Sequence, residues 1–178
     1  MKYLGLLCMA TAAVAGGFLM AGEWEMRVKL LGIFRQMAVY LKARILYSNE
    51  TLPEALKEVG NRFADESSGM AAEAGLFFLR VEKRMEEEKG RPFSEIWVEE
   101  TEKFPDDLPL GKQDIEAIRT LGKNLGYADK KTQERTILFY LEQADDSLAF
   151  LKKEMESRTK LYRSLGMAAG LFILVLFA

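Results

Sequence analysis

The closing stretch of the chain, Asp129 to Ala178, constrains the fold more than any other. It contains no proline, so one helix can run through all of it. From Leu165 onward no side chain is ionisable. Before that point, apolar residues recur mostly at alternating spacings of four and three, as in a helix packed lengthwise on partner helices; they are Ile137, Leu141, Ala144, Leu148, Leu151, Met155 and Tyr162. The pattern predicts one helix that leaves a helical bundle and enters a lipid bilayer.

The beginning of the chain carries a second apolar run. Tyr3 to Ala21 holds no charge and follows Lys2; as a helix it would span about 28 Å, close to the roughly 30 Å of a hydrocarbon core. A cleaved signal peptide is the alternative, because a lysine, an apolar stretch and small residues also fit that pattern. A membrane anchor is favoured, since the run is longer than a typical signal core and its helical register continues into Trp24 and Val28.

The last run, residues 165–178, is shorter, about 21 Å as a helix, and local bilayer thinning would have to cover the difference. Lys160 and Arg163 stand where they can snorkel to the interface. Basic residues near both runs lie on the side of the middle segment, whereas the outer side offers only Lys2. We therefore expect an N-terminal transmembrane helix (1–21), a cytoplasmic bundle (22–164) and a C-terminal transmembrane helix (165–178), with both termini outside.

The middle segment shows helical periodicity and no strand pattern. Helix breaks are expected at Ser48, before a capping box formed by Thr51 and Glu54, at Ser67-Ser68, at Lys89-Gly90, in the loop 105–109 and at Gly126. A short helix opened by Pro92 would carry Phe93, Ile96, Trp97 and Phe104. The sequence predicts an all-α bundle of about six helices, whose first and last members extend into the membrane and hold the shorter helices between them.

The composition narrows the chemistry. There is no histidine, and the single cysteine, Cys8, lies in the first apolar run; catalysis through histidine, His or Cys zinc sites and an internal disulfide are excluded. Adjacent carboxylates such as Glu99-Glu100 diverge on a helix, and Glu86 to Glu88 is interpreted as a solvated helix end. The formal net charge is −2, whereas a nucleic-acid-binding domain usually carries a clustered excess of basic residues. We expect no catalytic, cofactor or metal site, no nucleic acid and no small-molecule substrate.

The turn within residues 121–133 is rich in glycine and polar residues and has two interpretations. Structurally, Gly126 would be a left-handed helix cap, Asp129 would cap the long helix and Gly122 would let two helices approach closely. Functionally, the same turn would be an exposed docking knuckle at the tip of the bundle. The candidate partner-docking residues are Asp114, Gly122, Gly126, Asp129 and Gln133.

Several stretches of the chain, taken together in their order and spacing, are specific enough to compare with a known family. They are the glycine-rich first run, Glu50 to Leu56, Trp97, Leu121-Gly122 with Leu125-Gly126, Asp129 to Gln133, and Tyr162 to Gly166 with Gly170. In these stretches the chain resembles the stage III sporulation protein AB family across nearly its whole length. Members of that family resemble the helical domain of the inner-membrane platform protein of type II secretion systems. The resemblance thus implies a helical bundle as well.

The resemblance also implies a place in the multiprotein complex between mother cell and forespore. The expected partners are a cytoplasmic ATPase from the same operon and other membrane proteins of the complex, with the bundle on the mother-cell side. We expect a non-enzymatic membrane scaffold that couples this ATPase to a secretion-like channel. An exported helical binding module with a cleaved N-terminal signal is the alternative.

Overall fold

The computed structural model describes the backbone of residues 2–48, 50–65, 69–126 and 129–177, and side chains for those of them between residues 24 and 157. Over these ranges the chain forms six α-helices and no strand, which confirms the predicted fold class. The helices are α1 (Lys2–Leu46), α2 (Leu52–Ala64), α3 (Gly69–Glu87), α4 (Phe93–Glu102), α5 (Lys112–Leu125) and α6 (Lys130–Phe177).

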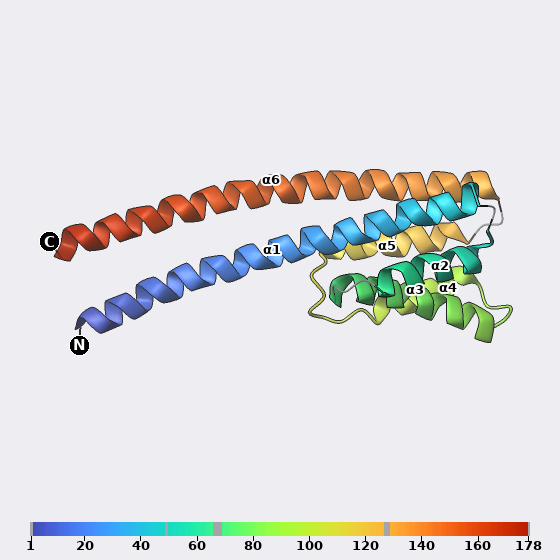
Figure 1. The fold of residues 1–178 in the computed structure, drawn as a ribbon, viewed down its shortest axis with the longest axis horizontal. Helices are drawn as coiled ribbons and strands as arrows, with labels where there is room; N and C mark the ends of the chain where they lie inside the picture. Colours follow the sequence, from blue (N-terminus) through green and yellow to red (C-terminus); the bar gives the residue numbers. More distant parts are fainter. Residues whose placement is uncertain (1, 49, 66–68, 127–128, 178) are drawn as a thin grey trace.

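The two long helices, α1 and α6, run side by side in opposite directions (Figure 1). The four short helices gather along one flank of this pair, at the end where α1 stops and α6 begins. There α2 and α3 pack on α1, α5 packs on α6, and α4 lies against both α3 and α5. The expectation that the short helices sit between the long ones is wrong, because the apolar faces of α1 and α6 meet each other directly as well as the short helices.

An ion pair shows the register of the two long helices. Arg35 on α1 binds both carboxylate oxygens of Asp145 on α6, with Nη2 3.0 Å from Oδ2. Because the helices are antiparallel, equal numbers of residues counted from this pair lead to the same level. Residues 2 and 177 are therefore nearly level, each roughly 50 Å of helix from the pair. Figure 1 accordingly shows both chain ends at the same end of the molecule.

The core is built on the predicted apolar faces. On α1 the buried side chains continue at three- and four-residue spacing the helical register predicted through Trp24 and Val28, and they include Leu31, Phe34, Ala38, Leu41 and Ile45. On α6 they are Ile137, Tyr140, Ala144, Leu148 and Leu151; Tyr140 is buried where Leu141 was predicted, and Leu141 is only half-buried. Burying each large aliphatic side chain contributes about 2 kcal/mol. This burial stabilises helices that would be marginal alone.

Ring contacts join three helices around Phe77 of α3. Its ring centroid lies 4.8 Å from that of Trp97 on α4, 6.2 Å from that of Phe34 on α1 and 4.9 Å from that of Phe104. Phe104 was predicted within the fourth helix, but α4 ends at Glu102 and Phe104 follows in the turn. The turn allows this side chain to reach back over α3 and α1.

The helix boundaries of the middle segment follow local signals. At the start of α2 the Glu54 carboxylate accepts a hydrogen bond from the Thr51 amide at 2.8 Å, as expected of the capping box. After α3, Gly90 adopts a φ of 96°. That left-handed conformation favours glycine, and it reverses the chain into α4.

A pair of glycines allows α2 and α3 to pack closely. A Cβ on Gly75 would lie 2.7 Å from the carbonyl oxygen of Gly60, and a Cβ on Gly60 would lie 2.8 Å from the side chain of Leu79. Both distances are shorter than side chains tolerate. The contact therefore needs glycine at position 75, which faces backbone, whereas a side chain at position 60 would require Leu79 to shift.

Within the part of the chain that the structure describes, no helix combines the length and apolar character needed to cross a membrane. The predicted anchors, residues 1–21 and 165–178, lie outside the residues with described side chains. The boundaries proposed for the three segments stay predictions.

Candidate functional site

The five candidate docking residues fall in two places. Gly122, Gly126, Asp129 and Gln133 gather where α5 ends and α6 begins, and we call this region the α5–α6 corner. Asp114 lies in the first turn of α5, roughly 18 Å of helix away. The side chains of Asp114 and Gln133 are buried, and so is Gly122. Only Gly126 and Asp129 are exposed, so the five do not form one surface.

Gly122 lies against the indole ring of Trp97. A Cβ at this position would overlap the ring. The Trp97 indole Nε1 donates a hydrogen bond to the carbonyl oxygen of Ile118 at 2.9 Å, one turn earlier on α5. The prediction that Gly122 allows a close helix approach is confirmed, and the helices involved are α4 and α5.

Gly126 has a φ of −70° and a ψ of 3°. The predicted left-handed cap is therefore wrong. A Cβ here would lie 3.1 Å from Cδ1 of Phe93, at the start of α4. The close approach of an aromatic ring, and not a special backbone conformation, is the structural role of glycine at the end of α5.

Asp129 caps α6, as predicted. Its carboxylate accepts hydrogen bonds from the backbone amide of Thr132 at 3.0 Å and from its hydroxyl at 2.9 Å. The bonds from Thr132 lower the pKa of Asp129. One turn after Asp129, the Gln133 side-chain amide donates a hydrogen bond to the carbonyl oxygen of Leu125 at 3.3 Å. This bond satisfies one of the carbonyl groups that the end of α5 leaves open.

Asp114 links α5 to α1. Its Oδ2 accepts hydrogen bonds from Nε of Arg27 at 2.7 Å and from the Gly111 amide at 2.8 Å. A Cβ on Gly111 would overlap the guanidinium of Arg27. The buried carboxylate thus fixes the loop before α5 onto α1, only a few residues beyond the first predicted anchor.

Burial raises the pKa of the Tyr140 hydroxyl, and the negative charge of Asp114 raises it further. Neither Oδ1 of Asp114 nor the Tyr140 hydroxyl has a hydrogen-bond partner among the described residues. Tyr140 therefore stays protonated at physiological pH and contributes a neutral side chain to the core.

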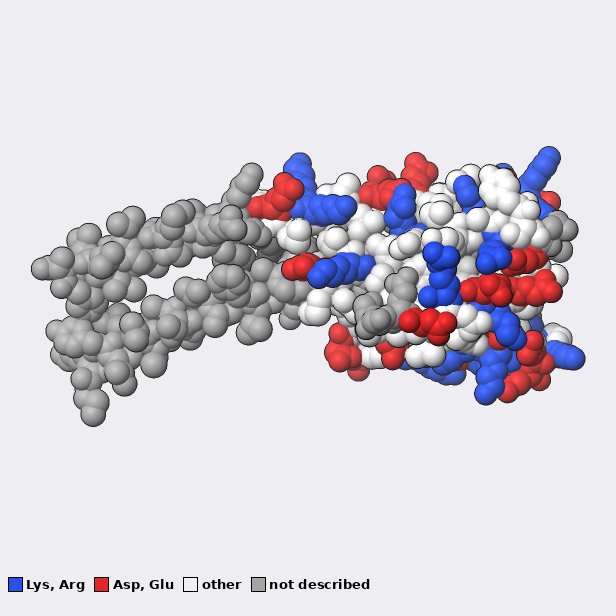
Figure 2. All heavy atoms as spheres, in the orientation of Figure 1, with Lys and Arg blue, Asp and Glu red and all other residues white. Residues whose placement is uncertain are grey.

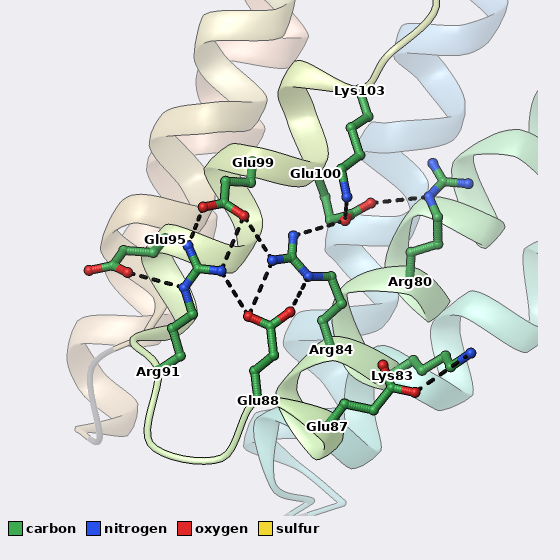
Figure 3. A network of polar contacts seen from close by, with 10 residues as sticks. All are labelled: Arg80, Lys83, Arg84, Glu87, Glu88, Arg91, Glu95, Glu99, Glu100 and Lys103. Carbon is green, nitrogen blue, oxygen red and sulfur yellow. Dashed lines mark hydrogen bonds and ion pairs between the residues drawn. The ribbon is translucent and has the colours of Figure 1, made fainter.

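The densest polar cluster lies elsewhere, between α3 and α4 (Figure 3). We call it the α3–α4 ion network. Two arginines lie at its centre, one near the end of α3 and one in the turn that follows. Arg84 contacts Glu88 at 2.6 Å and Glu99 at 2.8 Å, and Arg91 contacts Glu88 at 2.8 Å and also binds Glu99. Two carboxylates and two guanidiniums therefore form a closed ring of ion pairs.

Glu100 carries the buried end of this network. Its side chain is 1% exposed, yet three cations contact it: Lys103 at 2.5 Å, Arg84 at 3.1 Å and Arg80 at 3.2 Å. Burial opposes its ionisation, but the hydrogen bonds from Lys103, Arg84 and Arg80 outweigh burial and lower its pKa. Glu100 is therefore ionised, and its charge is compensated within the fold.

This network was not predicted from the sequence. Glu88 was interpreted as part of a solvated helix end, but it binds Arg84 and Arg91, whose hydrogen bonds lower its pKa to about 2. The signal available was the i, i+4 pair of Arg84 and Glu88. The contacts across the turn to Glu99 and Glu100 depend on the chain reversal at Gly90, which a helical pattern does not specify.

The acidic side chains of the described residues do not converge on a metal site. Among these residues, no three His, Cys, Asp or Glu side chains are placed to hold a metal ion. Figure 2 shows acidic and basic side chains interspersed over the visible face of the bundle. Many of these charged side chains form ion pairs with one another, between helices or within one helix, as in the α3–α4 ion network. The arrangement is suited to holding helices together and presenting surfaces.

The sequence matches the family model described as Stage III sporulation protein AB (spore_III_AB) over residues 2–178. It is also similar to Stage III sporulation protein AB of Bacillus subtilis (strain 168), with 26% identity over 176 residues, which cover 99% of this chain and 98% of that protein. No solved structure gives a significant match. Since the family model spans almost the entire chain, the protein belongs to the Stage III sporulation protein AB family.

Proposed function

We propose that this protein is a non-enzymatic scaffold in a sporulation complex, rooted in the membrane by the ends of α1 and α6. In this proposal the bundle lies on the mother-cell side and couples a cytoplasmic ATPase to a secretion-like channel. The family assignment supports a role in sporulation. The scaffold role, the membrane location and the ATPase partner go beyond what family membership gives.

The observation that carries the proposal is the equal projection of the two long helices. Both extend beyond the short helices at the same end of the molecule, and their ends are nearly level (Figure 1). The projecting parts, about residues 2–23 and 158–177, would each be roughly 30 Å long, which matches the thickness of a hydrocarbon core. The charge-free runs 3–21 and 165–178 fall within these parts. Two antiparallel helices that project together in this way are suited to anchoring the protein in a bilayer.

The continuity of α1 favours a retained anchor over a cleaved signal. The helix runs from Lys2 to Leu46 without a break. Signal cleavage near Ala21 would cut this helix just before Trp24, which packs on the core. The mass of the intact N-terminus distinguishes the two readings, because signal cleavage would remove about twenty residues.

The contacts at the base of the bundle support a rigid connection. Arg27 and Asp114 fix the loop before α5 onto α1, and Arg35 and Asp145 fix α1 onto α6. Both links lie between the projecting ends and the α5–α6 corner. A movement imposed on the short helices would therefore reach both long helices.

The proposed coupling is tested with the full chain in lipid nanodiscs and the purified ATPase encoded in the same operon. We expect ATP-dependent co-sedimentation of the two, which a nanodisc without this protein does not give. An absence of binding, both with and without the remaining membrane proteins of the complex, would remove the coupling role.

Membrane topology has a separate test. A reporter that is active only outside the cytoplasm, fused to the C-terminus, should be active, and the same reporter inserted in the 105–109 loop should be silent. Activity of a cytoplasm-only reporter at the C-terminus would contradict the proposed topology.

A further inference from the structure

A pocket of about 280 Å³ lies on the surface between α5 and α6, and we call it the α5–α6 groove. The surface that its lining exposes is mostly apolar, with Ala117 and Leu121 of α5 and Phe139 and Tyr140 of α6. The remaining lining residues are polar: Thr120, Asn124, Arg135, Thr136 and Gln143. Phe139 is 54% exposed although it is a large aromatic residue. The volume is enough for one large apolar side chain from outside.

The apolar surface continues past the groove onto the seam of α1 and α6. Val39 and Leu138 are both exposed. Val39 lies one turn beyond Arg35, and Leu138 lies two turns before Asp145, on the helix faces that form the Arg35–Asp145 ion pair. Since these helices are antiparallel, the two side chains lie at nearly the same level as Phe139. The three residues and the groove form one band across the molecule.

Charges are unequal on the two sides of this band. Toward the α5–α6 corner, Arg135 lines the groove and Lys131 lies one turn before it; both are exposed. Arg135 has no ion-pair partner among the described residues. In the opposite direction along α6, the exposed residues Glu142 and Asp146 follow at helical spacing. The band is thus apolar with a basic end and an acidic end.

We propose that the α5–α6 groove binds an amphipathic helix of a partner protein. One large apolar side chain of that helix fills the groove beside Phe139, and carboxylates about one turn away bind Arg135 and Lys131. Recognition by an apolar face with flanking charges is a common mode of helix binding. The complementary charges fix the direction of the bound helix, with its acidic end toward the α5–α6 corner.

A second copy of this chain fits less well. Copies rooted in the same membrane would present α6 in parallel, which places Arg135 opposite Arg135 and Glu142 opposite Glu142. An antiparallel pairing would satisfy these charges, but it would direct the projecting ends of α1 and α6 in opposite directions. This step alone rests on the proposed membrane anchoring; the groove and its charges do not.

The test is site-specific photo-crosslinking of the full chain in membranes of sporulating cells. The photoreactive amino acid p-benzoylphenylalanine replaces Phe139, and the matched control carries it in place of Phe150, an exposed phenylalanine farther along the same helix. The crosslinked peptide is sequenced by mass spectrometry. We expect an adduct at position 139, several times more abundant than at 150, with a segment that has apolar residues at helical spacing and at least two carboxylates.

A charge variant sharpens the test. Arg135→Glu should lower the yield of this adduct about tenfold, whereas Arg135→Lys should keep it within about twofold. Lys153→Glu, an exposed position of α6 away from the groove, should leave the yield unchanged. Unaltered thermal melting of the three variants shows that they fold.

Three outcomes overturn the inference: adducts only with lipid or with a second copy of this chain, adducts with a basic segment, or a yield no higher than at position 150. None of these outcomes decides whether the ATPase binds to the full chain in nanodiscs. A failure of the groove and a failure of the proposed coupling are therefore distinguishable.

Discussion

Helix α4 contacts its two neighbours, α5 and α3, in contrasting ways. Where α4 meets α5, glycines lie directly against aromatic rings, and the hydrogen bonds join neutral groups, as from Trp97 to Ile118. Where α4 meets α3, nearly all of the polar contacts are ion pairs around Arg84 and Glu100. The first contact depends on shape, whereas the second adds ion pairs to the ring contact between Phe77 and Trp97. They should therefore respond differently to added volume, to salt and to pH.

The largest effect is expected at Gly122. Gly122→Ala places a methyl group in the Trp97 ring, which cannot move without losing its hydrogen bond to Ile118. Overpacking of this kind costs about 1 to 3 kcal/mol of unfolding free energy, measured by urea denaturation of the full chain in detergent. Gly32→Ala is the matched control, because no atom lies within 4 Å of its added Cβ. That helical substitution should stabilise by about 0.5 to 1 kcal/mol. Equal effects of the two variants would disprove the shape argument.

Next in size is the neutralisation of Glu100. Glu100→Gln leaves the positive charges of Arg80, Arg84 and Lys103 without their shared buried partner. Removing one partner of a buried ion pair costs about 3 to 5 kcal/mol, and less here because the cations reach solvent, so we expect about 2 kcal/mol. Glu99→Gln, at a more exposed carboxylate of the same network, should cost clearly less. The unfolding midpoint in urea, with and without added salt, measures both; a larger loss for Glu99→Gln would contradict the role of burial.

A smaller effect on stability is expected from pH, and of the two contacts compared only the α3–α4 ion network should respond. Hydrogen bonds from Arg84 and Arg91 lower the pKa of Glu88 to about 2, and the pKa of Glu99 is lowered by the same arginines. A lowered pKa in the folded state stabilises the fold above the ordinary glutamate value of about 4.3, and this contribution is lost as the pH falls toward 2. Urea midpoints between pH 6 and pH 3 should fall less steeply in Glu88→Gln. The Gly122→Ala variant should keep the slope of the unmodified protein, and a changed slope there would count against the contrast.

The smallest effect is expected at the cap of α6. Asp129→Ala removes the acceptor for the Thr132 amide and hydroxyl, whereas Asp129→Asn keeps an acceptor oxygen. We expect the alanine variant to lower the melting temperature slightly and the asparagine variant to restore most of the loss. Equal melting temperatures for both variants would show that the cap contributes little to stability.

The sequence predicts the apolar parts of this structure well, because their signals are local. Helical periodicity identified the buried faces of α1 and α6, and the capping residues Thr51 and Asp129 identified two helix starts. Gly122 was recognised as a point of close approach, although its partner Trp97 could not be named from spacing. Each of these signals acts within one or two turns of a helix.

The parts that could not be predicted depend on how helices meet. The direct pairing of α1 with α6 is decided by which apolar faces bury together. The contact of Gly126 with Phe93, a residue of another helix, likewise has no local signal. The ion network joins residues whose positions depend on the turn at Gly90. Likewise, the α5–α6 groove arises between two helices and has no signature in either one.

The Arg35–Asp145 ion pair has a mechanical consequence. A load carried equally by the tips of both long helices would stretch them together and leave this contact at rest. A ligand in the α5–α6 groove would contact α6 directly and α1 only through α5 and the Arg27–Asp114 ion pair, so part of any pull transmitted through it would slide one long helix past the other. The ion pair and the apolar seam around it would then be loaded in shear, and their strength would set how large a pull this protein transmits before its two long helices slip.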